Sequence, residues 1–368
     1  MSNATRTMKA VVAHELNKFS VEEVTLAPPK AGEVLVKIKA TGICHSDLSV
    51  INGTIPVPFP MVLGHEGAGI VEEVGEGVTA VKVGDHVALS FVPNCGECYH
   101  CLRAEANLCL KSTPDGKMMD GTSRVQLNGE DINVMQFLGN MAEYAVVPEV
   151  SVVAIDKDID MKAAALVGCG VTTGVGAALK TAEVKPGSTV AVFGAGGVGL
   201  SIIQGARIAG AVRIIAVDLS DEKLAIAREL GATDTVNASG NPVKEIMALT
   251  GGIGVDYGFE AIGIPAVVDQ AQKATRRGGT MTVVGVGRLD QKLELNALMF
   301  PMTGKTFKGS MYGSAEFKVD FPTYLDLYKQ GKLDLDRMVT STYSIDEAPQ
   351  AFADLESGKN ARGVIVYD

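Results

Sequence analysis

Four of the six cysteines fall within fifteen residues, at Cys95, Cys98, Cys101 and Cys109. The loop that carries them also contains glycine and asparagine, and unpaired thiols rarely cluster in such a polar segment. Four thiolates complete a tetrahedral zinc shell and leave no position open for water or substrate. The spacing therefore predicts a structural zinc site in a lobe of about residues 93–112, with His100 as a bystander.

The other two cysteines, Cys44 and Cys169, lie far apart in the sequence, and His65 lies between them in Gly-His-Glu-Gly. Two thiolates and one imidazole leave the fourth position of a zinc ion open, as a catalytic site requires. Spacing alone leaves a second interpretation open, because a buried cysteine often acts only as a small apolar side chain.

A glycine-rich turn follows the apolar run Thr189–Phe193 and precedes a helical pattern. In such a turn one glycine permits the sharp bend, one lets the backbone approach a pyrophosphate and one lets the helix pack on the strand. The free N–H groups of the helix start then favour the anion. The glycine pattern alone is equally typical of an ordinary turn. The residues of this candidate site are Gly194, Gly196, Gly197, Val198 and Gly199.

Asp218 strengthens the interpretation as a nucleotide site, because it lies 19 residues after Gly199, at the end of the next apolar run. An acid there accepts hydrogen bonds from ribose hydroxyls and repels a 2′-phosphate, so the sequence predicts NAD rather than NADP. The alternative is a helix cap ahead of Glu222. Lys223 could reach the same ribose, or be an ordinary solvated lysine.

The elements that must position these residues change character near Cys169. Residues 8 to about 150 contain short β patterns, Val34–Ala40, Gly69–Val74 and His86–Phe91 among them, and no long amphipathic helix. After Cys169, apolar runs alternate with helical patterns, which indicates a parallel sheet covered by helices on both faces. The apolar runs are Thr189–Phe193, Ile214–Val217, Val255–Phe259 and Met281–Val284, and the helical patterns are Leu200–Ala209 and Glu222–Leu230. Nearer the C-terminus we expect helices near Phe321–Lys329 and Asp346–Leu355, followed by a strand at Gly363–Tyr367.

Composition excludes several classes of protein. The 368 residues are 46% hydrophobic and 21% charged, with a net charge of −10 and no basic cluster, so we expect a globular protein without a nucleic-acid surface. The longest uncharged stretch, Ala163–Leu179, is short and rich in glycine and threonine, and this favours a buried turn and helix over a membrane span. No signal-peptide pattern is evident, so we expect a cytoplasmic protein with reduced thiols.

Taken together, these motifs and their order along the chain resemble those of a known protein family. Gly42–Asp47, Gly64–Glu72, the four-cysteine lobe, Gly168–Gly170 and the glycine turn follow in an order that resembles the zinc-containing medium-chain alcohol dehydrogenases, from about Met8 to Tyr367. The lobe and Asp120–Arg124 look most like the longer, dimeric animal-type branch. The resemblance implies an α/β fold with two domains. They are a Rossmann doubly wound parallel sheet (171–311) and a partly barrel-like, mainly β, GroES-like catalytic domain (1–170 and 312–368).

The resemblance also assigns roles. It implies that Cys44, His65 and Cys169 bind catalytic zinc, that Glu66 lies behind the metal and that Asp47 orients His65. Ser46 would contact the substrate hydroxyl. Ser46 and Asp47 could instead be turn residues, and Arg362 a surface cation. The remaining implied cofactor contacts are His45 and Arg362 at the pyrophosphate, and Thr173, Val198 and Val284 near the nicotinamide. Val286 is also expected to contact the cofactor.

By this resemblance the protein transfers hydride between a primary aliphatic or aromatic alcohol and NAD, with two zinc ions per chain. The implied pocket is apolar, with Ile55, Phe91, Met141 and Val286. Ile55 replaces the acid of the glutathione-adduct-oxidising branch. The only partners expected are the alcohol or aldehyde and a second copy of the chain, as a homodimer or alternatively a homotetramer, with no nucleic acid and no membrane.

Two features depart from the family pattern. Ser49 stands where many relatives have a proton-relaying histidine, and Leu138–Glu143 is about two residues shorter than in the animal-type branch. Three other functions are weighed against this prediction: a zinc-dependent secondary-alcohol or polyol dehydrogenase, a zinc-free quinone reductase, and a redox-inactive NAD-binding protein. The quinone reductase would leave all seven ligands without a role, and intact ligands in both sets argue against the inactive protein.

Overall fold

The computed structural model describes residues 4–112, 115–360 and 362–368. The chain forms two compact units. One comprises Met1–Cys169, Glu316–Lys329 and Val339–Asp368, and is called the β unit below. The other comprises Gly170–Ala315 and Gln330–Met338, and is called the nucleotide unit.

Part of the β unit is a small closed barrel whose interior is filled by alternate apolar residues of its strands, Met8, Val24 and Ile132 among them. Its strands, in order around the barrel, are β1 (Arg6–Glu15), β2 (Lys18–Leu26), β7 (Val125–Leu127), β8 (Glu130–Val134) and β4 (Met61–Val62).

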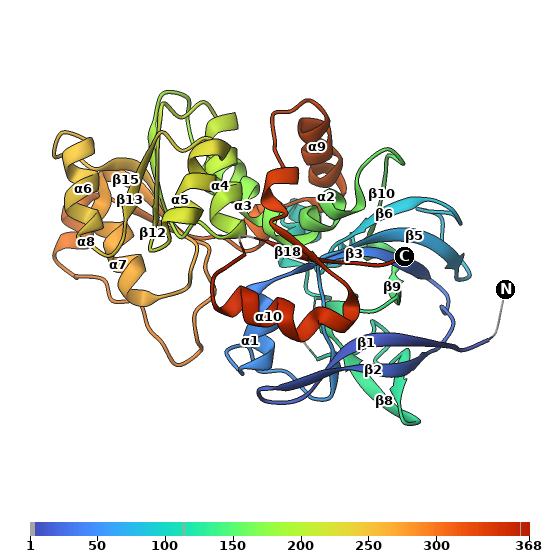
Figure 1. Ribbon diagram of the computed structural model, residues 1–368. Coiled ribbons are helices and arrows are strands. Elements are labelled where there is room, and N and C mark those ends of the chain that lie inside the picture. Colours follow the sequence, from blue (N-terminus) through green and yellow to red (C-terminus); the bar gives the residue numbers. More distant parts are fainter. Residues whose placement is uncertain (1–3, 113–114, 361) are drawn as a thin grey trace. The chain divides into compact units, whose positions relative to one another are not determined.

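A seven-stranded sheet makes up the rest of the β unit's strands. The last strand of the chain pairs antiparallel with β3, so that Gly363 lies opposite Ile43, next to the first predicted zinc ligand. Figure 1 shows these two strands, blue and red, side by side. The strands are β10 (Val152–Ile155), β6 (His86–Leu89), β5 (Gly67–Val74), β3 (Glu33–Ile43), β18 (Gly363–Val366) and β17 (Ser341–Tyr343), with β9 (Tyr144–Pro148) also on β3.

The described residues of the β unit form four helices, together with short single turns. The helices are α1 (His45–Ile51), α2 (Met161–Leu166), α9 (Phe317–Lys329) and α10 (Ala348–Glu356). The turns include η1 (Cys101–Arg103), η2 (Ala106–Leu108), η3 (Met135–Phe137), η4 (Glu149–Ser151) and η9 (Ile345–Glu347).

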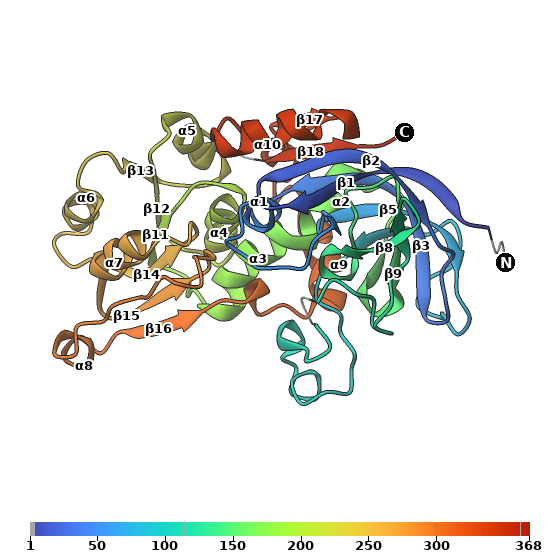
Figure 2. The same cartoon turned by 90° about the horizontal axis from the view of Figure 1, so that it is seen from below.

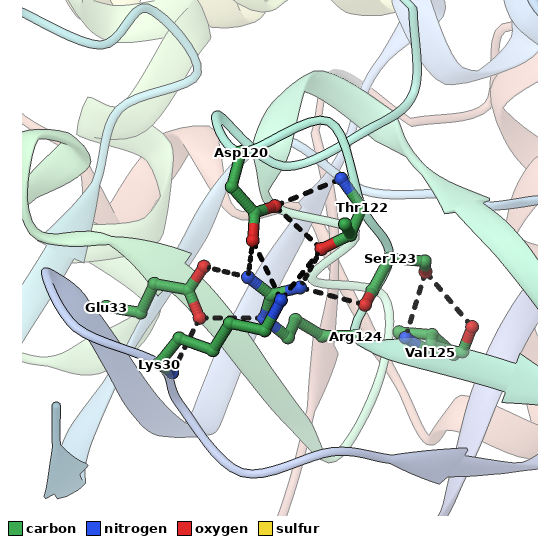
Figure 3. Close-up of polar contacts among 7 residues, drawn as sticks. All are labelled: Lys30, Glu33, Asp120, Thr122, Ser123, Arg124 and Val125. Carbon is green, nitrogen blue, oxygen red and sulfur yellow. Dashed lines mark hydrogen bonds and ion pairs between the residues drawn. The ribbon is translucent and has the colours of Figure 1, made fainter.

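A buried ion pair fastens the segment after the lobe to the start of β3. The Arg124 guanidinium, 2% exposed, donates to both carboxylate oxygens of Glu33, at 2.8 and 2.6 Å (Figure 3). Arg124 also donates to Asp120 at 2.8 Å, and Lys30 reaches the same carboxylate from the surface at 2.9 Å. The bidentate geometry offsets the cost of removing both charges from water. The Asp120–Arg124 stretch therefore has a structural role.

The nucleotide unit is a six-stranded sheet in which every neighbouring pair is parallel. Its centre is apolar, with Ala191, Ile215 and Met281 fully buried. The strand order is β13 (Asp234–Asn237), β12 (Arg213–Asp218), β11 (Thr189–Phe193), β14 (Val255–Glu260), β15 (Thr275–Val283) and β16 (Thr306–Gly309).

Helices cover both faces of this sheet. The helices α4 and α5 pack together on one face, and α6 and α7 pack together on the other (Figures 1 and 2). The helices of this unit are α3 (Thr172–Gly176), α4 (Gly197–Ile208), α5 (Asp221–Leu230), α6 (Pro242–Leu249), α7 (Pro265–Ala274) and α8 (Met299–Thr303), and the short turns are η7 (Tyr312–Ser314) and η8 (Asp336–Met338). The predicted fold class, a doubly wound parallel sheet plus a partly barrel-like β domain, is confirmed.

Most predicted elements occur close to their predicted bounds. Gly210 and Gly231 end α4 and α5 with φ of +83° and +124°, a conformation that glycine adopts without strain. Strand β13 and helices α6 and α7 were not predicted. Asp234–Asn237 contains a single buried apolar residue, Val236, so it carries no apolar run that a sequence pattern could detect.

The helical stretch Met161–Thr181 is long and apolar enough to cross a membrane, but 83% of its most apolar window is buried inside the protein, as in a core helix. It includes two π-helical turns, η5 (Val167–Val171) and η6 (Ala177–Thr181). Cys169 lies in the first of them. Such π turns often occur at functional sites because they redirect side chains.

Candidate active site

The structure brings the three predicted catalytic ligands together in the β unit. Cys44 lies between β3 and α1, His65 precedes β5, and Cys169 lies in the π-helical turn. Potential ligand atoms of Cys44, His65, Cys169 and also Glu66 all lie within 4.8 Å of one another, and all four residues are buried. A strand, a helix start and a π-helical turn thus supply one donor set.

Asp47 fixes the orientation of this donor set. Its carboxylate accepts hydrogen bonds from the backbone N–H groups of Cys44 and Gly64, both at 3.1 Å, and from His65 Nδ1 at 3.2 Å. With its proton on Nδ1, His65 presents the lone pair of Nε2. That atom is buried, and no described residue hydrogen-bonds to it. A buried imidazole nitrogen rarely lacks a partner, and a metal ion between two thiols would supply one. The residues therefore fit a zinc ion.

The electrostatics of the Cys44 thiol agree with this fit, whereas the hydrogen bond to Cys44, together with burial, raises the pKa of Cys169. The pKa of Cys44 is lowered well below its usual value, chiefly by a hydrogen bond from Cys169, then by the charge of His65, and against the cost of burial. Thiolate is the form that binds zinc.

Glu66 and Arg362 form a buried ion pair beside the ligands. Arg362, 4% exposed, donates to Glu66 Oε1 at 2.9 Å and to the carbonyl of Ile43 at 3.3 Å. Burial raises the pKa of Glu66 to about 7, although the charge of Arg362 opposes this rise. Glu66 Oε2 is also buried without a partner among the described residues. The sequence interpretation placed Arg362 on a pyrophosphate or at the surface; the surface alternative is wrong, and the structure shows a different partner.

The other predicted residues around the ligands differ in exposure. The Ser46 hydroxyl lies 3.7 Å from Cys44 Sγ, and His45 is exposed at the start of α1. The ring of Phe91 meets the ring of His65 edge to face, with centroids 5.6 Å apart. Ile55 and Met141 pack in one apolar cluster, in which Met141 is fully buried. Met141 therefore backs the site from the core and does not present an open surface.

The four-cysteine lobe also gathers as predicted, with its sulfur atoms all within 4.8 Å of one another. The loop lies away from the strands of the β unit (Figure 2). Backbone N–H groups of Cys101 and Leu110 lower the pKa of Cys98 to about 6. Such N–H donors stabilise the Cys98 thiolate, whereas burial raises the pKa values of Cys101 and Cys109. The close approach of four sulfur atoms is therefore the observation that fits a second, closed zinc site.

The glycine turn of the nucleotide unit has the geometry that a pyrophosphate requires. Gly194 has φ of +98°. A Cβ on Gly199 would overlap the carbonyl oxygen of Gly194, whereas a Cβ on Gly196 would meet nothing within 4 Å. The space beside the middle glycine, Gly196, is therefore free for a ligand, and Gly196 is the N-cap residue of α4. This combination fits an anion bound at the helix start.

Asp218 stands beside this turn at the end of β12. Its Oδ2 accepts the N–H of Ala195 at 2.7 Å, inside the glycine turn, and its Oδ1 accepts that of Ser220 at 3.0 Å. The helix-cap alternative for Asp218 is wrong, because Ser220 caps α5 through the N–H of Lys223. Each Asp218 oxygen keeps a lone pair for a ribose hydroxyl.

The remaining residues predicted at the cofactor also belong to the nucleotide unit. Thr173 lies in α3 and Val198 in the first turn of α4, and both are half-buried. Val284 directly follows β15 and is buried, whereas Val286 is 62% exposed.

Sequence reasoning missed Asn140. This residue is fully buried, and its amide lies between the glycines that flank His65 and Glu66. A Cβ on Gly64 would lie 2.6 Å from Asn140 Oδ1, and a Cβ on Gly67 would overlap Nδ2. Gly64 and Gly67 are visible in the sequence and indicate that another group packs closely against them, but the sequence does not identify that group as Asn140.

Comparison with known proteins agrees with both units. Residues 30–157 match the model of the alcohol dehydrogenase GroES-like domain, and residues 197–330 match that of zinc-binding dehydrogenases. An alcohol dehydrogenase zinc-binding domain protein from Burkholderia ambifaria is 37% identical over 99% of this chain and 100% of that one, with a TM-score of 0.94. Benzyl alcohol dehydrogenase from Acinetobacter calcoaceticus is 34% identical over 99% of this chain and 100% of that one, with a TM-score of 0.93.

A zinc-binding dehydrogenase from Sinorhizobium meliloti, whose structure was solved with NADP bound, is 28% identical over 98% of this chain and 100% of that one, with a TM-score of 0.83. The fold and the two cysteine-containing donor sets are those of a zinc-binding oxidoreductase. The chain belongs to the zinc-dependent alcohol dehydrogenases of the medium-chain family. The similarity to the animal-type branch stays a prediction.

The ion pair at the ligands gives a first testable prediction. Replacing Arg362 with Met should lower the free energy of unfolding of the cofactor-free protein by about 3–5 kcal/mol, because Glu66 would be left buried without its partner. Urea unfolding measures this change, and adding Glu66→Gln to the same chain should restore part of it. If Arg362→Met leaves the stability unchanged and weakens only the binding of NADH, the pyrophosphate is the main partner of Arg362.

Proposed function

We propose that the protein transfers hydride between a primary aliphatic or aromatic alcohol and NAD, with one catalytic and one structural zinc ion per chain. The observation that carries this proposal is the donor set of Cys44, His65 and Cys169. Asp47 holds His65 through Nδ1, and the buried Nε2 has no hydrogen-bond partner among the described residues. Three such ligands leave a fourth position for the oxygen of an alcohol.

The apolar residues around the ligands support an apolar substrate. Phe91 touches the His65 ring, and Ile55 lies half-buried in the cluster next to the ligands. Neither can stabilise a charged group on the substrate. The relative from Acinetobacter, which is named for benzyl alcohol, supports an aromatic primary alcohol as one substrate.

The chemistry that the bound groups supply is Lewis acidity at the alcohol oxygen and a hydride acceptor. Ser46 is placed beside Cys44 to accept the hydroxyl proton of the alcohol while its own proton passes outward. The electron pair of the carbinol C–H bond leaves with the hydride, and the product is an aldehyde. Ser49 can relay the released proton but cannot hold it at neutral pH, so water is the final acceptor.

The nucleotide unit supports NAD as the cofactor. Asp218 keeps its carboxylate beside the glycine turn, where it would meet the ribose hydroxyls and repel a 2′-phosphate. The Sinorhizobium relative was solved with NADP and another solved relative with NADH, so the choice between the two nucleotides has to be tested for this chain.

We further propose that two copies associate through the β16 end of the parallel sheet, in the cytoplasm. Strand β16 is an edge strand, with one row of backbone groups facing no strand of its own sheet. The neighbouring segment exposes several large apolar side chains, and such a patch marks an interface. They are Leu289, Leu293, Leu295, Leu298, Met299 and Met302.

A panel of alcohols tests the proposed function. The purified protein is offered benzyl alcohol, hexanol, a secondary alcohol and sorbitol, each with NAD or NADP, and nucleotide reduction is followed by absorbance. We expect the primary alcohols with NAD to give the highest kcat/KM. Preference for the secondary alcohol or sorbitol would favour a secondary-alcohol or polyol dehydrogenase, and no turnover with any alcohol would contradict the proposal.

The two zinc sites should respond differently to removal of a ligand. Cys169→Ser should abolish turnover and lose one zinc ion while the fold persists, because the open site holds the reacting oxygen. Cys95→Ser should lose the other zinc ion and lower the melting temperature more, because a closed site couples metal binding to folding. Elemental analysis, circular dichroism and the alcohol assay measure these changes. Full turnover in a protein without zinc would contradict both assignments.

Cofactor choice should depend on Asp218. Asp218→Asn removes the charge but keeps an oxygen for the N–H of Ala195, so the glycine turn should stay intact. Affinity for NAD should fall about 10- to 100-fold, since a hydrogen bond to a charged group contributes about 1.5–3 kcal/mol, and affinity for NADP should rise. Titration with NADH and NADPH measures both. An unmodified protein that prefers NADPH would contradict the role of Asp218.

A further inference from the structure

A second buried carboxylate lies at the end of β14, in the nucleotide unit. Glu260 is fully buried, and its Oε1 accepts three consecutive backbone N–H groups, from Ile262 at 2.9 Å, Gly263 at 2.7 Å and Ile264 at 3.4 Å. No cation pairs with it in the described part of the chain. Burial of a carboxylate is costly, so such a residue needs these donors to remain charged. Burial raises the pKa of Glu260, and the three N–H groups oppose this rise.

The three N–H groups belong to the loop Ala261–Ile264, which connects β14 to α7. The Glu260 side chain therefore accepts hydrogen bonds from three of the four residues of this loop. It leads directly into the N-terminus of α7, whose positive dipole end also favours a carboxylate. The side chains of Ile262 and Ile264 are exposed, so the loop presents an apolar surface outward.

This loop contacts the ends of both neighbouring strands. Ala261 donates to the carbonyl of Phe193 at 2.9 Å, at the end of β11, and a Cβ on Gly194 would lie 2.7 Å from Ile262 Cγ1. On the other side, the N–H groups of Val284 and Gly285 donate to the backbone carbonyl of Glu260, at 2.8 and 3.0 Å. A Cβ on Gly285 would overlap the backbone nitrogen of Gly263. The loop thus sets the spacing between the glycine turn and the segment after β15.

The order of the strands in the sheet predicts which part of a bound dinucleotide this loop would contact. From β11 the chain proceeds outward through β12 and β13, and then returns to place β14, β15 and β16 on the other side of β11. A dinucleotide lies across this reversal, with one nucleoside on each side. Asp218, at the end of β12, is on the adenosine side. Glu260 and its loop are on the opposite side, where the second nucleoside lies.

We propose that Glu260 is a positioning residue: its carboxylate holds the loop Ala261–Ile264 in the conformation that receives the nicotinamide riboside half of NAD. This inference rests on the proposed function, because it assumes that the dinucleotide is NAD. Its role is distinct from that of Asp218, since it acts through the loop and on the other half of the cofactor.

The experiment compares NADH with ADP, which has the adenosine and both phosphates but lacks the second nucleoside. Dissociation constants are measured by calorimetry for the full-length wild-type protein, Glu260→Ala, Glu260→Gln and a control. The matched control is Asp256→Ala. Asp256 lies on the same strand and accepts the N–H of Thr189 at 2.7 Å, but near the N-terminal end of β14, whereas Glu260 is at its C-terminal end.

We expect Glu260→Ala to weaken NADH about ten-fold, because the loop must then be ordered at the expense of binding energy, and to leave ADP within about two-fold. Glu260→Gln should bind NADH nearly as well as the wild type, since the amide oxygen can accept the same three N–H groups. Asp256→Ala should lower the melting temperature and leave the ratio of the two dissociation constants unchanged.

The outcomes separate this inference from the function on which it rests. If the wild-type protein binds ADP but not NADH, the proposed function fails. If the wild type binds NADH and Glu260→Ala leaves that affinity unchanged, or weakens NADH and ADP equally, Glu260 does not position the nicotinamide half. Should Glu260→Ala fail to fold, Glu260→Asp replaces it, and the same comparison of NADH with ADP decides.

Discussion

The β unit depends on the ion pair of Glu66 and Arg362, two buried groups 296 positions apart in the sequence. Glu66 adjoins a zinc ligand, and a Cβ on Gly42 would overlap its carboxylate. Arg362 immediately precedes β18 and reaches the carbonyl of Ile43, next to the ligand Cys44. A buried charge without its partner is strongly destabilising, so this pair favours the pairing of the last strand with β3, which the backbone ladder also holds. The contact joins the last strand of the sheet to the segments that carry two of the ligands.

Carboxylates that accept backbone N–H groups organise the loops of both units. Asp47 holds the backbone before α1 and before β5 while it orients His65. Asp218 holds the glycine turn, and Glu260 holds the loop that precedes α7. A loop has few apolar contacts to fix it, and a carboxylate with several N–H donors supplies directional bonds instead. Each of these carboxylates lies next to residues of a proposed metal or cofactor site.

The two metal sites differ in the way the chain builds them. The lobe cysteines come from one short segment, and local turns bring them together. The other site collects one thiol from a helix start, one histidine from a strand start and one thiol from a π-helical turn. A site built from distant segments needs a supporting shell, and here Asp47, Asn140 and the pair of Glu66 and Arg362 form it. The lobe is held by local backbone hydrogen bonds, such as that from Cys109 to Ala106.

The sequence by itself determined the features that depend on local geometry. Apolar runs and glycines predicted β11, β12, β14 and the ends of α4 and α5, because strand burial and helix termination follow from residues a few positions apart. Cysteine spacing predicted the lobe for the same reason. The resemblance in motifs then supplied Cys44, His65 and Cys169, which spacing alone left open.

Only the tertiary structure decided the partners of buried polar groups. It assigned Arg362 to Glu66, gave the cap of α5 to Ser220 rather than Asp218, and revealed the backbone donors of Glu260. Some of these contacts join residues that are far apart in the sequence, where no periodic pattern predicts them. Others depend on how neighbouring strands pack. A charged or amide side chain looks the same in a sequence whether it faces water or a buried partner. The free-energy cost of burial without a partner is what selects the contact, and that cost exists only once the chain has folded.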